Sequence, residues 1–265
     1  MDLLLTGKRA IVTGGSRGIG LAAARALAAE GCDVALVARD KSALEAARET
    51  VAAESGRRVI SVSADTGDEE SVRDMVRAVV AGLGGVDILV NAAARPNTGA
   101  VVGIEDFVDA EFSEQVNVKV LGYLRCIRQV VPLMRQSGWG RIINISGLAA
   151  RSTGSVTGTV RNVAVSALTK NLADELGRHG INVNVVHPGV TVTEKTPEIL
   201  AGRAERAGVS VAEVERRLGA SVGIGRLVTA EEVATVVAFL ASPVSVAING
   251  DAIAAGGGAL GHIYY

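Results

Sequence analysis

The feature that most constrains this chain is a repeated alternation of short apolar runs with longer amphipathic stretches. Six runs are rich in β-branched residues and apolar on both faces, as buried parallel strands are: 9–14, 33–38, 58–65, 86–92, 141–146 and 181–189. Helical patterns lie between them, at 18–30, 41–54, 68–83, 111–136 and 159–179. This order requires right-handed crossovers and a parallel sheet covered on both faces. The sequence therefore predicts a doubly wound α/β fold, with 248–258 as the candidate for a last strand.

Length and composition restrict the class of protein further. The 265 residues suit one domain with a large core, and no linker or repeat divides them, so we assign 1–265 to a single domain. The formal net charge of −1 argues against a nucleic-acid-binding surface. No apolar run approaches the ~18 residues of a membrane span. Two cysteines, Cys32 and Cys126, fit a reducing compartment. We expect a cytoplasmic protein without nucleic-acid or membrane partners.

The least regular stretch, residues 190–225, follows a Pro–Gly turn at 188–189. It contains two charged helical patterns, and we expect it to cover a ligand cleft and shape the substrate pocket. No His, Cys or carboxylate cluster has the spacing of zinc ligands, so no metal site is predicted.

A glycine-rich turn follows the first predicted strand. The sequence TGGSRGIG leads directly into the first predicted helix and supplies the candidate cofactor-binding residues Gly14, Ser16, Arg17, Gly18, Ile19 and Gly20. Glycine at these positions permits positive φ and lets the backbone come close to a pyrophosphate at the helix N-terminus. The context predicts nucleotide binding, and the alternative is a glycine-rich turn without a ligand.

Arg39 follows the second predicted strand, where dinucleotide-binding proteins read the 2′ position of the ribose. An acidic residue at position 38 would hydrogen-bond a free 2′-hydroxyl, but this chain has Ala38. Arg39 and Arg17 offer charge-assisted contacts to a 2′-phosphate instead. This pattern favours NADP over NAD, and the alternative is two solvated surface arginines.

These landmarks and several later ones resemble the short-chain dehydrogenase/reductase family. The later ones are Asp65 after the third strand, VNAAA (90–94), NIS (144–146), VNVVHPGVTVT (183–193), GRL…EEVA…FLAS (225–242) and ING…GGG (248–258). The resemblance covers essentially the whole chain and implies one Rossmann domain with a seven-stranded parallel sheet. It also implies that Asp65 lies at the adenine and Asn91 beside the ribose. It implies nicotinamide contacts from a segment that includes Pro188, Gly189, Thr191 and Thr193. VNAAA departs from the family's usual NNAG.

Family members reduce carbonyls or oxidise alcohols with a Ser, Tyr, Lys and Asn set. Its Tyr and Lys lie four residues apart on one helix face, where the ammonium stabilises the phenolate. Aligning TKNLADEL (169–176) without gaps puts Gly158 at the Tyr position and Asn162 at the Lys position. In any register no phenol lies in the first turn of this helix, because the only tyrosines are Tyr123, Tyr264 and Tyr265. The chain therefore resembles a divergent branch without the YxxxK pair.

Three residues are candidates for the remaining catalytic site. Ser146 is the candidate for the family Ser, with Gly147 as the alternative after a one-residue gap. Lys119 falls at the position of the family Asn, with Asn117 two residues earlier. If burial lowers its pKa, Lys119 can donate a proton or polarise a carbonyl, and the alternative is a lysine paired with a carboxylate. Asn162 is a candidate cofactor contact.

Two further residues lie near these positions. Arg161 is one residue from Asn162, about 100° around the helix, and we expect it at the surface. His187 precedes the Pro–Gly turn at the edge where ligands of parallel sheets bind, and we expect a packed or backbone-bonded histidine.

The favoured function is an NADP(H)-dependent oxidoreductase that transfers hydride to a small carbonyl or enone with atypical proton delivery. The alternative is a non-catalytic nucleotide-binding protein, either a sensor or the silent subunit of a heteromeric dehydrogenase. A hydride-free lyase or isomerase has no positive signal.

We also expect a homo-tetramer, with a hetero-oligomer containing an intact family member as the alternative. The two long helical patterns carry more apolar residues than one sheet can cover: Val118, Val120, Leu124 and Ile127 in one, Val163, Val165, Leu168 and Leu172 in the other. The tail at 262–265 is expected to reach a neighbouring subunit.

Overall fold

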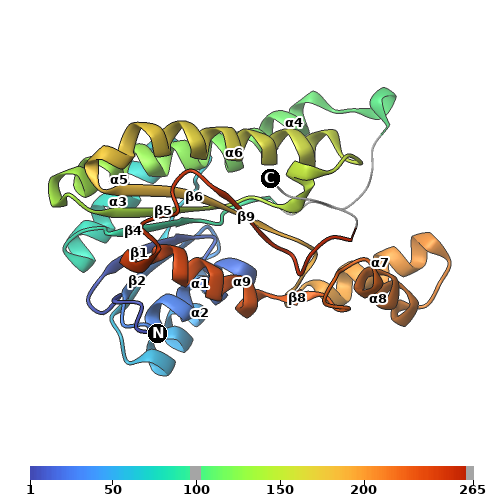
Figure 1. Ribbon diagram of the computed structural model, residues 1–265, viewed down its shortest axis with the longest axis horizontal. Helices are drawn as coiled ribbons and strands as arrows, with labels where there is room; N and C mark the ends of the chain where they lie inside the picture. The colour runs from blue at the N-terminus through green and yellow to red at the C-terminus, as the bar shows by residue number, and fades with distance from the viewer. Residues whose placement is uncertain (96–102, 261–265) are drawn as a thin grey trace.

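A seven-stranded parallel sheet in the order β3-β2-β1-β4-β5-β6-β9 forms the centre of the molecule (Figure 1). The structure, a computed structural model, describes residues 1–95 and 103–260. The strands are β1 (Arg9–Thr13), β2 (Asp33–Ala38), β3 (Val59–Ser63), β4 (Ile88–Asn91), β5 (Gly140–Ile145), β6 (Ile181–Pro188) and β9 (Ala252–Ala255). All six pairings in this sheet are parallel. The predicted fold class and the predicted last strand are confirmed. The strand order reverses between β1 and β4, which is where such sheets bind ligands.

Helices cover both faces of the sheet (Figure 1). One face carries α1 (Gly18–Ala29), α2 (Lys41–Ser55) and α9 (Ala230–Ala241). The other carries α3 (Glu69–Leu83), α5 (Gly122–Ser137) and α6 (Val156–Leu176). Because both faces are covered, the central strands are apolar on both sides.

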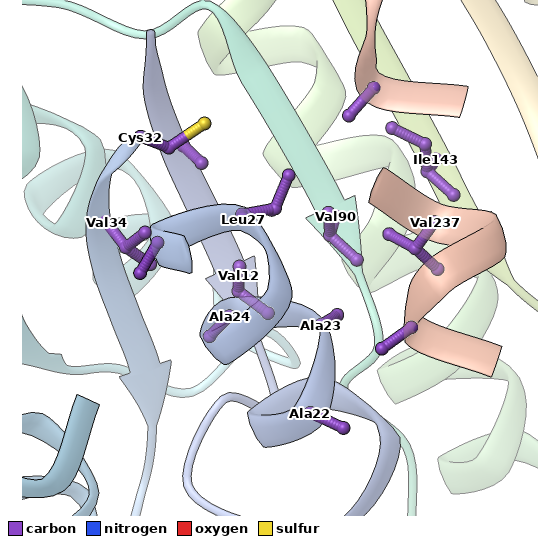
Figure 2. Close-up of a cluster of buried hydrophobic side chains, with 14 of the residues drawn as sticks. Val12, Ala22, Ala23, Ala24, Leu27, Cys32, Val34, Val90, Ile143 and Val237 are labelled. Atoms are coloured by element: carbon purple, nitrogen blue, oxygen red, sulfur yellow. The ribbon is translucent and has the colours of Figure 1, made fainter. Parts of the chain in front are cut away.

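The packing of α1 fixes the glycine turn at the edge of the sheet. Figure 2 shows Ala23 and Ala24 of α1 beside Val90 and Val12 of the sheet, and Ala22 belongs to the same buried cluster. These small side chains let the helix axis come close to the strands and to α9. The N-terminus of α1 therefore lies at the carboxyl end of β1, where an anion can be bound.

The predicted helix at 111–136 consists of three consecutive pieces. They are α4 (Asp109–Val116), the π-helical turn η2 (Asn117–Leu121) and α5. Turns of this kind occur frequently at functional sites, and Lys119 lies within this one. The predicted helix at 159–179 begins earlier, at Val156, because the hydroxyl of Ser155 accepts a hydrogen bond from the Gly158 N–H (3.0 Å) and caps the helix.

The segment 190–225 contains two helices, α7 (Thr196–Ala207) and α8 (Val211–Ala220), as its charged patterns predict. A second, two-stranded sheet was not predicted. In it β7 (Thr191–Val192) pairs in parallel with β8 (Val228–Thr229). This pairing attaches the segment to the start of α9, so that α7 and α8 extend from one end of the molecule (Figure 1).

The predicted surplus of apolar surface on the two long helices is only partly present. Val118, Ile127 and Val165 are buried within the chain's own core, so the expectation was wrong for these three. Val163 is exposed, and the other exposed large apolar residues of η2, α5 and α6 are Leu121, Val156 and Val160. The tail at 262–265 lies outside the described residues.

None of the helices that the structure describes is long and apolar enough to cross a membrane. Across residues 1–95 and 103–260, no three His, Cys, Asp or Glu side chains are grouped to hold a metal ion.

Candidate active site

A cleft of about 580 Å³ opens at the carboxyl ends of the central strands, a size typical of ligand pockets. Its walls come from the turns after β1, β2, β3, β4 and β5, from the η2–α5 junction, and from the start of segment 190–225. The residues that line it include Gly14, Ser16, Arg17, Ile19, Gly20, Arg39, Asp65, Lys119, Tyr123, Ser146, Thr193 and Lys195.

The glycine turn at one end of the cleft is sterically compact. A Cβ on Gly20 would lie 2.3 Å from the carbonyl oxygen of Gly14, so this close approach requires glycine. Gly14 itself has a φ of +69°. The N–H of Gly18, in the first turn of α1, donates to the carboxylate of Glu194 (3.1 Å). The N-terminus of α1 thus already binds an anionic group, as expected of a phosphate-binding turn.

Arg17 and Arg39 lie at the same end of the cleft, together with Asp65. Arg39 Nη1 is 3.9 Å from the Asp65 carboxylate, and Arg17 Nη2 is 3.2 Å from that of Asp40. Both guanidinium groups are about half exposed. Exposed ion pairs of this kind contribute little, so a ligand phosphate can replace either carboxylate.

Asn91 lies beneath the cleft wall rather than in it. Its side chain is completely buried and donates to Oδ1 of Asn144 (2.9 Å). The wall at this point is formed by Ala92, Ala93 and Ala94. The Asn91 side chain is therefore not among those that line the cleft, and the ribose contact expected of it stays a prediction.

The segment expected at the nicotinamide reaches the cleft through one residue, Thr193. Pro188 is the buried last residue of β6, and the Thr191 hydroxyl donates to the carbonyl oxygen of Gly189 (3.1 Å). The side chains of Pro188 and Thr191 do not line the cleft, because β7 turns this part of the chain toward β8.

Lys119, Ser146 and Asn162 are brought together by the fold. The Lys119 ammonium donates to the carbonyl oxygen of Ser146 (3.0 Å), and the Ser146 hydroxyl donates to the carbonyl oxygen of Asn162 (3.0 Å). Lys119 and Ser146 line the cleft, while Asn162 lies buried behind them. Within the described residues, Oδ1 of Asn162 has no hydrogen-bond partner.

Burial, together with the charge of Arg161, lowers the pKa of Lys119 to about 7. No carboxylate in the described part of the chain pairs with Lys119. The lysine therefore matches the first sequence interpretation, a buried amine near its titration point, rather than the alternative of a carboxylate-paired ammonium.

The expected surface position of Arg161 is wrong. Its side chain is buried, and its guanidinium donates to Oε1 of Gln115 and to the carbonyl oxygen of Arg95 (3.5 Å). The physical reason is that α4, which carries Gln115, packs across this face of α6. A helical wheel of α6 alone does not contain that information.

His187 is packed, as expected. Its Nδ1 accepts from the Gly147 N–H (3.3 Å), and its Nε2 lies 3.2 Å from the Ser166 hydroxyl. Burial, together with the charge of Arg151, lowers its pKa to about 4. His187 is therefore neutral at ordinary pH and is not a source of protons.

Sequence reasoning did not single out Tyr123, which also lines the cleft. Its hydroxyl donates to the carbonyl oxygen of Ile145 (2.9 Å), and burial raises its pKa. The sequence signal that could have identified Tyr123 is its position four residues after Lys119, because helical side chains at this spacing lie on one face.

Comparison with known proteins places this geometry in a family. Over residues 14–259 the chain matches the family model described as Enoyl-(Acyl carrier protein) reductase. It is 36% identical over 252 residues to the short-chain reductase protein NovJ of Streptomyces niveus, covering 94% of this chain and 92% of that protein. The chain belongs to the short-chain dehydrogenase/reductase family.

Other short-chain dehydrogenase/reductases show the same similarity. The D-beta-hydroxybutyrate dehydrogenase of Cupriavidus necator is 32% identical, over 93% of this chain and 95% of that protein. The crystal structure of L-sorbose reductase from Gluconobacter frateurii, complexed with NADPH and L-sorbose, superposes with a TM-score of 0.92 at 30% identity, covering 99% and 100% of the two chains. Membership makes this protein an NAD(P)-dependent oxidoreductase by type.

Proposed function

We propose that the protein transfers hydride between NADPH and a small carbonyl or enone substrate, and that Lys119 delivers the proton. The observation that carries this proposal is the position of the Lys119 ammonium, which lines the cleft with a pKa of about 7. A general acid is most effective when its pKa lies near the working pH.

The residues present fit an NADP cofactor. The glycine turn and the Gly18 N–H would hold the pyrophosphate, where Glu194 now supplies the anionic group. Arg39 and Arg17 would contact the 2′-phosphate, and Asp65 lies at the same end of the cleft for the adenine. L-sorbose reductase is described with NADPH, and a 29% identical relative from Bacillus subtilis is named NADPH-dependent reductase BacG.

Lys119 completes the reduction in this proposal. NADPH, when bound, would provide the hydride for the carbonyl carbon. The Lys119 ammonium gives its proton to the carbonyl oxygen, which yields the alcohol, and solvent then reprotonates the neutral amine. The carbonyl oxygen of Ser146 holds the amine in place. We infer that Gly158 and Asn162 occupy the usual Tyr and Lys positions, which makes the chain a member of a divergent branch.

Two other groups near the cleft are less suited to this role. The Tyr123 phenol already donates to a main-chain oxygen and has a raised pKa. The imidazole of His187 is neutral, because its pKa is about 4.

Single-turnover oxidation of NADPH against a panel of ketones and enones tests the proposal, with a parallel NADPH binding titration. Lys119→Met should abolish turnover and leave NADPH affinity within a few-fold. Tyr123→Phe is the control, because Tyr123 lies on the same helix face as Lys119, and this variant should retain turnover. Turnover that survives Lys119→Met would refute the assignment. NADPH binding without any turnover in the parent protein would favour the non-catalytic alternative.

We further propose that the protein is a homo-oligomer, most simply a tetramer. Val156, Val160 and Val163 are exposed at helical spacing on α6, which supports burial of this face against another subunit. Light scattering at micromolar concentration tests this proposal, and a monomeric mass would refute it. Co-purification with an intact family member would instead support a hetero-oligomer.

A further inference from the structure

Two buried cations, Lys119 of η2 and Arg161 of α6, lie close enough beside the cleft for the charge of Arg161 to lower the pKa of Lys119. Lys119 is 5% exposed and Arg161 is 7% exposed. The ammonium contacts the carbonyl oxygen of Ser146, and the guanidinium contacts Oε1 of Gln115 and the carbonyl oxygen of Arg95. All three of these oxygens are neutral. Neither cation forms an ion pair with a carboxylate in the part of the chain that the structure describes.

The acidic residue next to Gln115 in the sequence does not neutralise Lys119 or Arg161. Glu114 precedes Gln115 but pairs with Arg95 (2.6 Å). Within the described residues, Nε of Arg161 is buried and has no acceptor. The guanidinium therefore keeps a free donor, and an arginine cannot become neutral by losing its proton.

Arg141 shows how this chain satisfies a buried arginine that has no ligand. It is 2% exposed, but it donates to the carbonyl oxygens of Gly140, Gly180 and Ser242, and it stacks 4.7 Å from the centre of the Trp139 ring. Its cationic neighbour Lys8, 4.0 Å from the centre of the same ring, is only partly buried. Arg161 has fewer acceptors, and its cationic neighbour is itself buried.

Burying one unpaired charge is costly, and burying two of the same sign side by side is more so. Natural proteins keep such charges where a ligand completes the pair. Lys119 lines the cleft, and Arg161 contacts Arg95, the residue that follows the cleft wall at 92–94. An anion bound between them would lie in the cleft beside Lys119, with Arg161 behind this part of the wall.

We propose that the substrate is an oxo acid whose carboxylate is bound by Lys119 and Arg161. This inference rests on the proposed function, because it specifies the substrate class for the same site. The bound carboxylate also favours the ammonium form of Lys119, so that an anionic substrate brings the acid into its proton-donating state. A neutral ketone of the same size lacks this interaction.

Binding measured without turnover tests the inference. Isothermal titration calorimetry of the NADP⁺-saturated protein would compare 3-oxobutanoate and 4-oxopentanoate, each against its methyl ester. Two acids are used because they differ in the distance between carboxylate and carbonyl. At pH 7 we expect at least one acid to bind tenfold or more tightly than its ester. Equal affinities of both acids and their esters would overturn the inference.

Variants of Lys119 and Arg161 test whether these two cations cause the preference for the acid over its ester. Arg161→Gln and Lys119→Met should each reduce the affinity for the acid about tenfold or more and leave that for the ester within about twofold. Arg161→Lys keeps the charge and should retain most of the preference. Lys170→Gln, on the exposed face of α6, is the matched control. A preference that survives both Arg161→Gln and Lys119→Met would overturn the inference.

The pH dependence of binding gives a second readout. Arg161 of α6, Tyr123 of α5 and His187 of β6 are the ionisable groups that interact with this cluster. Of these groups and Lys119, only Lys119 titrates near pH 7. Affinity for the acid should therefore fall as the pH rises through 7, and Lys119→Met should remove this dependence. An unchanged pH profile in that variant would contradict the role of Lys119.

Two outcomes separate this inference from the proposed function. Binding of the acid without hydride transfer would leave the anion site standing and refute the proposed function. Reduction of neutral ketones with no preference for the oxo acids over their esters would keep the function and refute the anion site. Acid binding that disappears when NADP⁺ is present would assign the cations to the cofactor and also refute the inference.

Discussion

The burial of Lys119 predicts an unusual dependence of stability on pH. Its folded-state pKa of about 7 lies well below its ordinary value of 10.5, chiefly because burial disfavours the charged form. Between these two values the unfolded chain holds a proton at Lys119 that the folded chain has released. Stability therefore rises with pH across this window.

The magnitude follows from the same two values. One pKa unit corresponds to about 1.4 kcal/mol, so the full effect is roughly 5 kcal/mol. Between pH 7 and pH 9 the gain from Lys119 alone is roughly 2 kcal/mol. Lys119→Met removes the titrating group and keeps an apolar side chain of similar length. The variant should be more stable than the parent at pH 7, and its advantage should shrink by roughly 2 kcal/mol by pH 9.

Urea unfolding at pH 7, 8 and 9 measures this difference. Comparing parent and variant at each pH removes the contributions of all other titrating groups. Lys170→Met is the control, because Lys170 is exposed and pairs with Asp174. Its difference from the parent should not change with pH. A parent-to-variant difference for Lys119→Met that is constant over pH 7–9 would refute the reasoning.

Three further predictions concern the cofactor and catalytic ends. Arg39→Asp should reduce the preference for NADPH over NADH at least tenfold in a fluorescence titration, because it removes a cation at the proposed 2′-phosphate site. Glu194→Gln should tighten NADPH binding several-fold by calorimetry, because a carboxylate no longer competes for the Gly18 N–H. Gly158→Tyr combined with Asn162→Lys should raise the rate of reduction of small ketones, since it restores a phenol–ammonium pair on one helix face.

For each of these three predictions, one experimental result would refute it. Equal affinities of the parent protein for NADPH and NADH would exclude the role of Arg39. Glu198→Gln is the control for Glu194→Gln, because Glu198 lies four residues away on the same segment. An equal effect of the two changes on NADPH affinity would mean that only net charge matters. Unchanged ketone reduction in the double variant, with normal NADPH binding, would show that Gly158 and Asn162 do not occupy the expected positions.

The sheet and its helices could be predicted from local sequence patterns. The β-branched apolar runs at 33–38 and 181–189 indicate buried strands because parallel strands covered on both faces need apolar residues on both sides. The glycine turn at 14–20 was recognisable because tight turns restrict residue type at a few adjacent positions. The π-helical turn η2 and the small sheet β7–β8 were missed, because neither has a distinctive local pattern.

Which residues meet at the cleft depended on which helices and strands pack together. Gly18 and Glu194 meet although they lie 176 residues apart, and the burial of Arg161 depends on α4 crossing α6. The hydrogen bond from Asn91 to Asn144 depends on the parallel register of β4 and β5.

The sequence alone determined the α/β class, the glycine turn after the first strand and the absence of a tyrosine from residues 156–176, since these depend on residue types and on contacts close along the chain. Only the tertiary structure decided that Lys119 and Arg161 are buried together beside the cleft. That arrangement depends on the relative positions of η2, α4 and α6, and distant parts of the chain set those positions through packing rather than through any local periodicity.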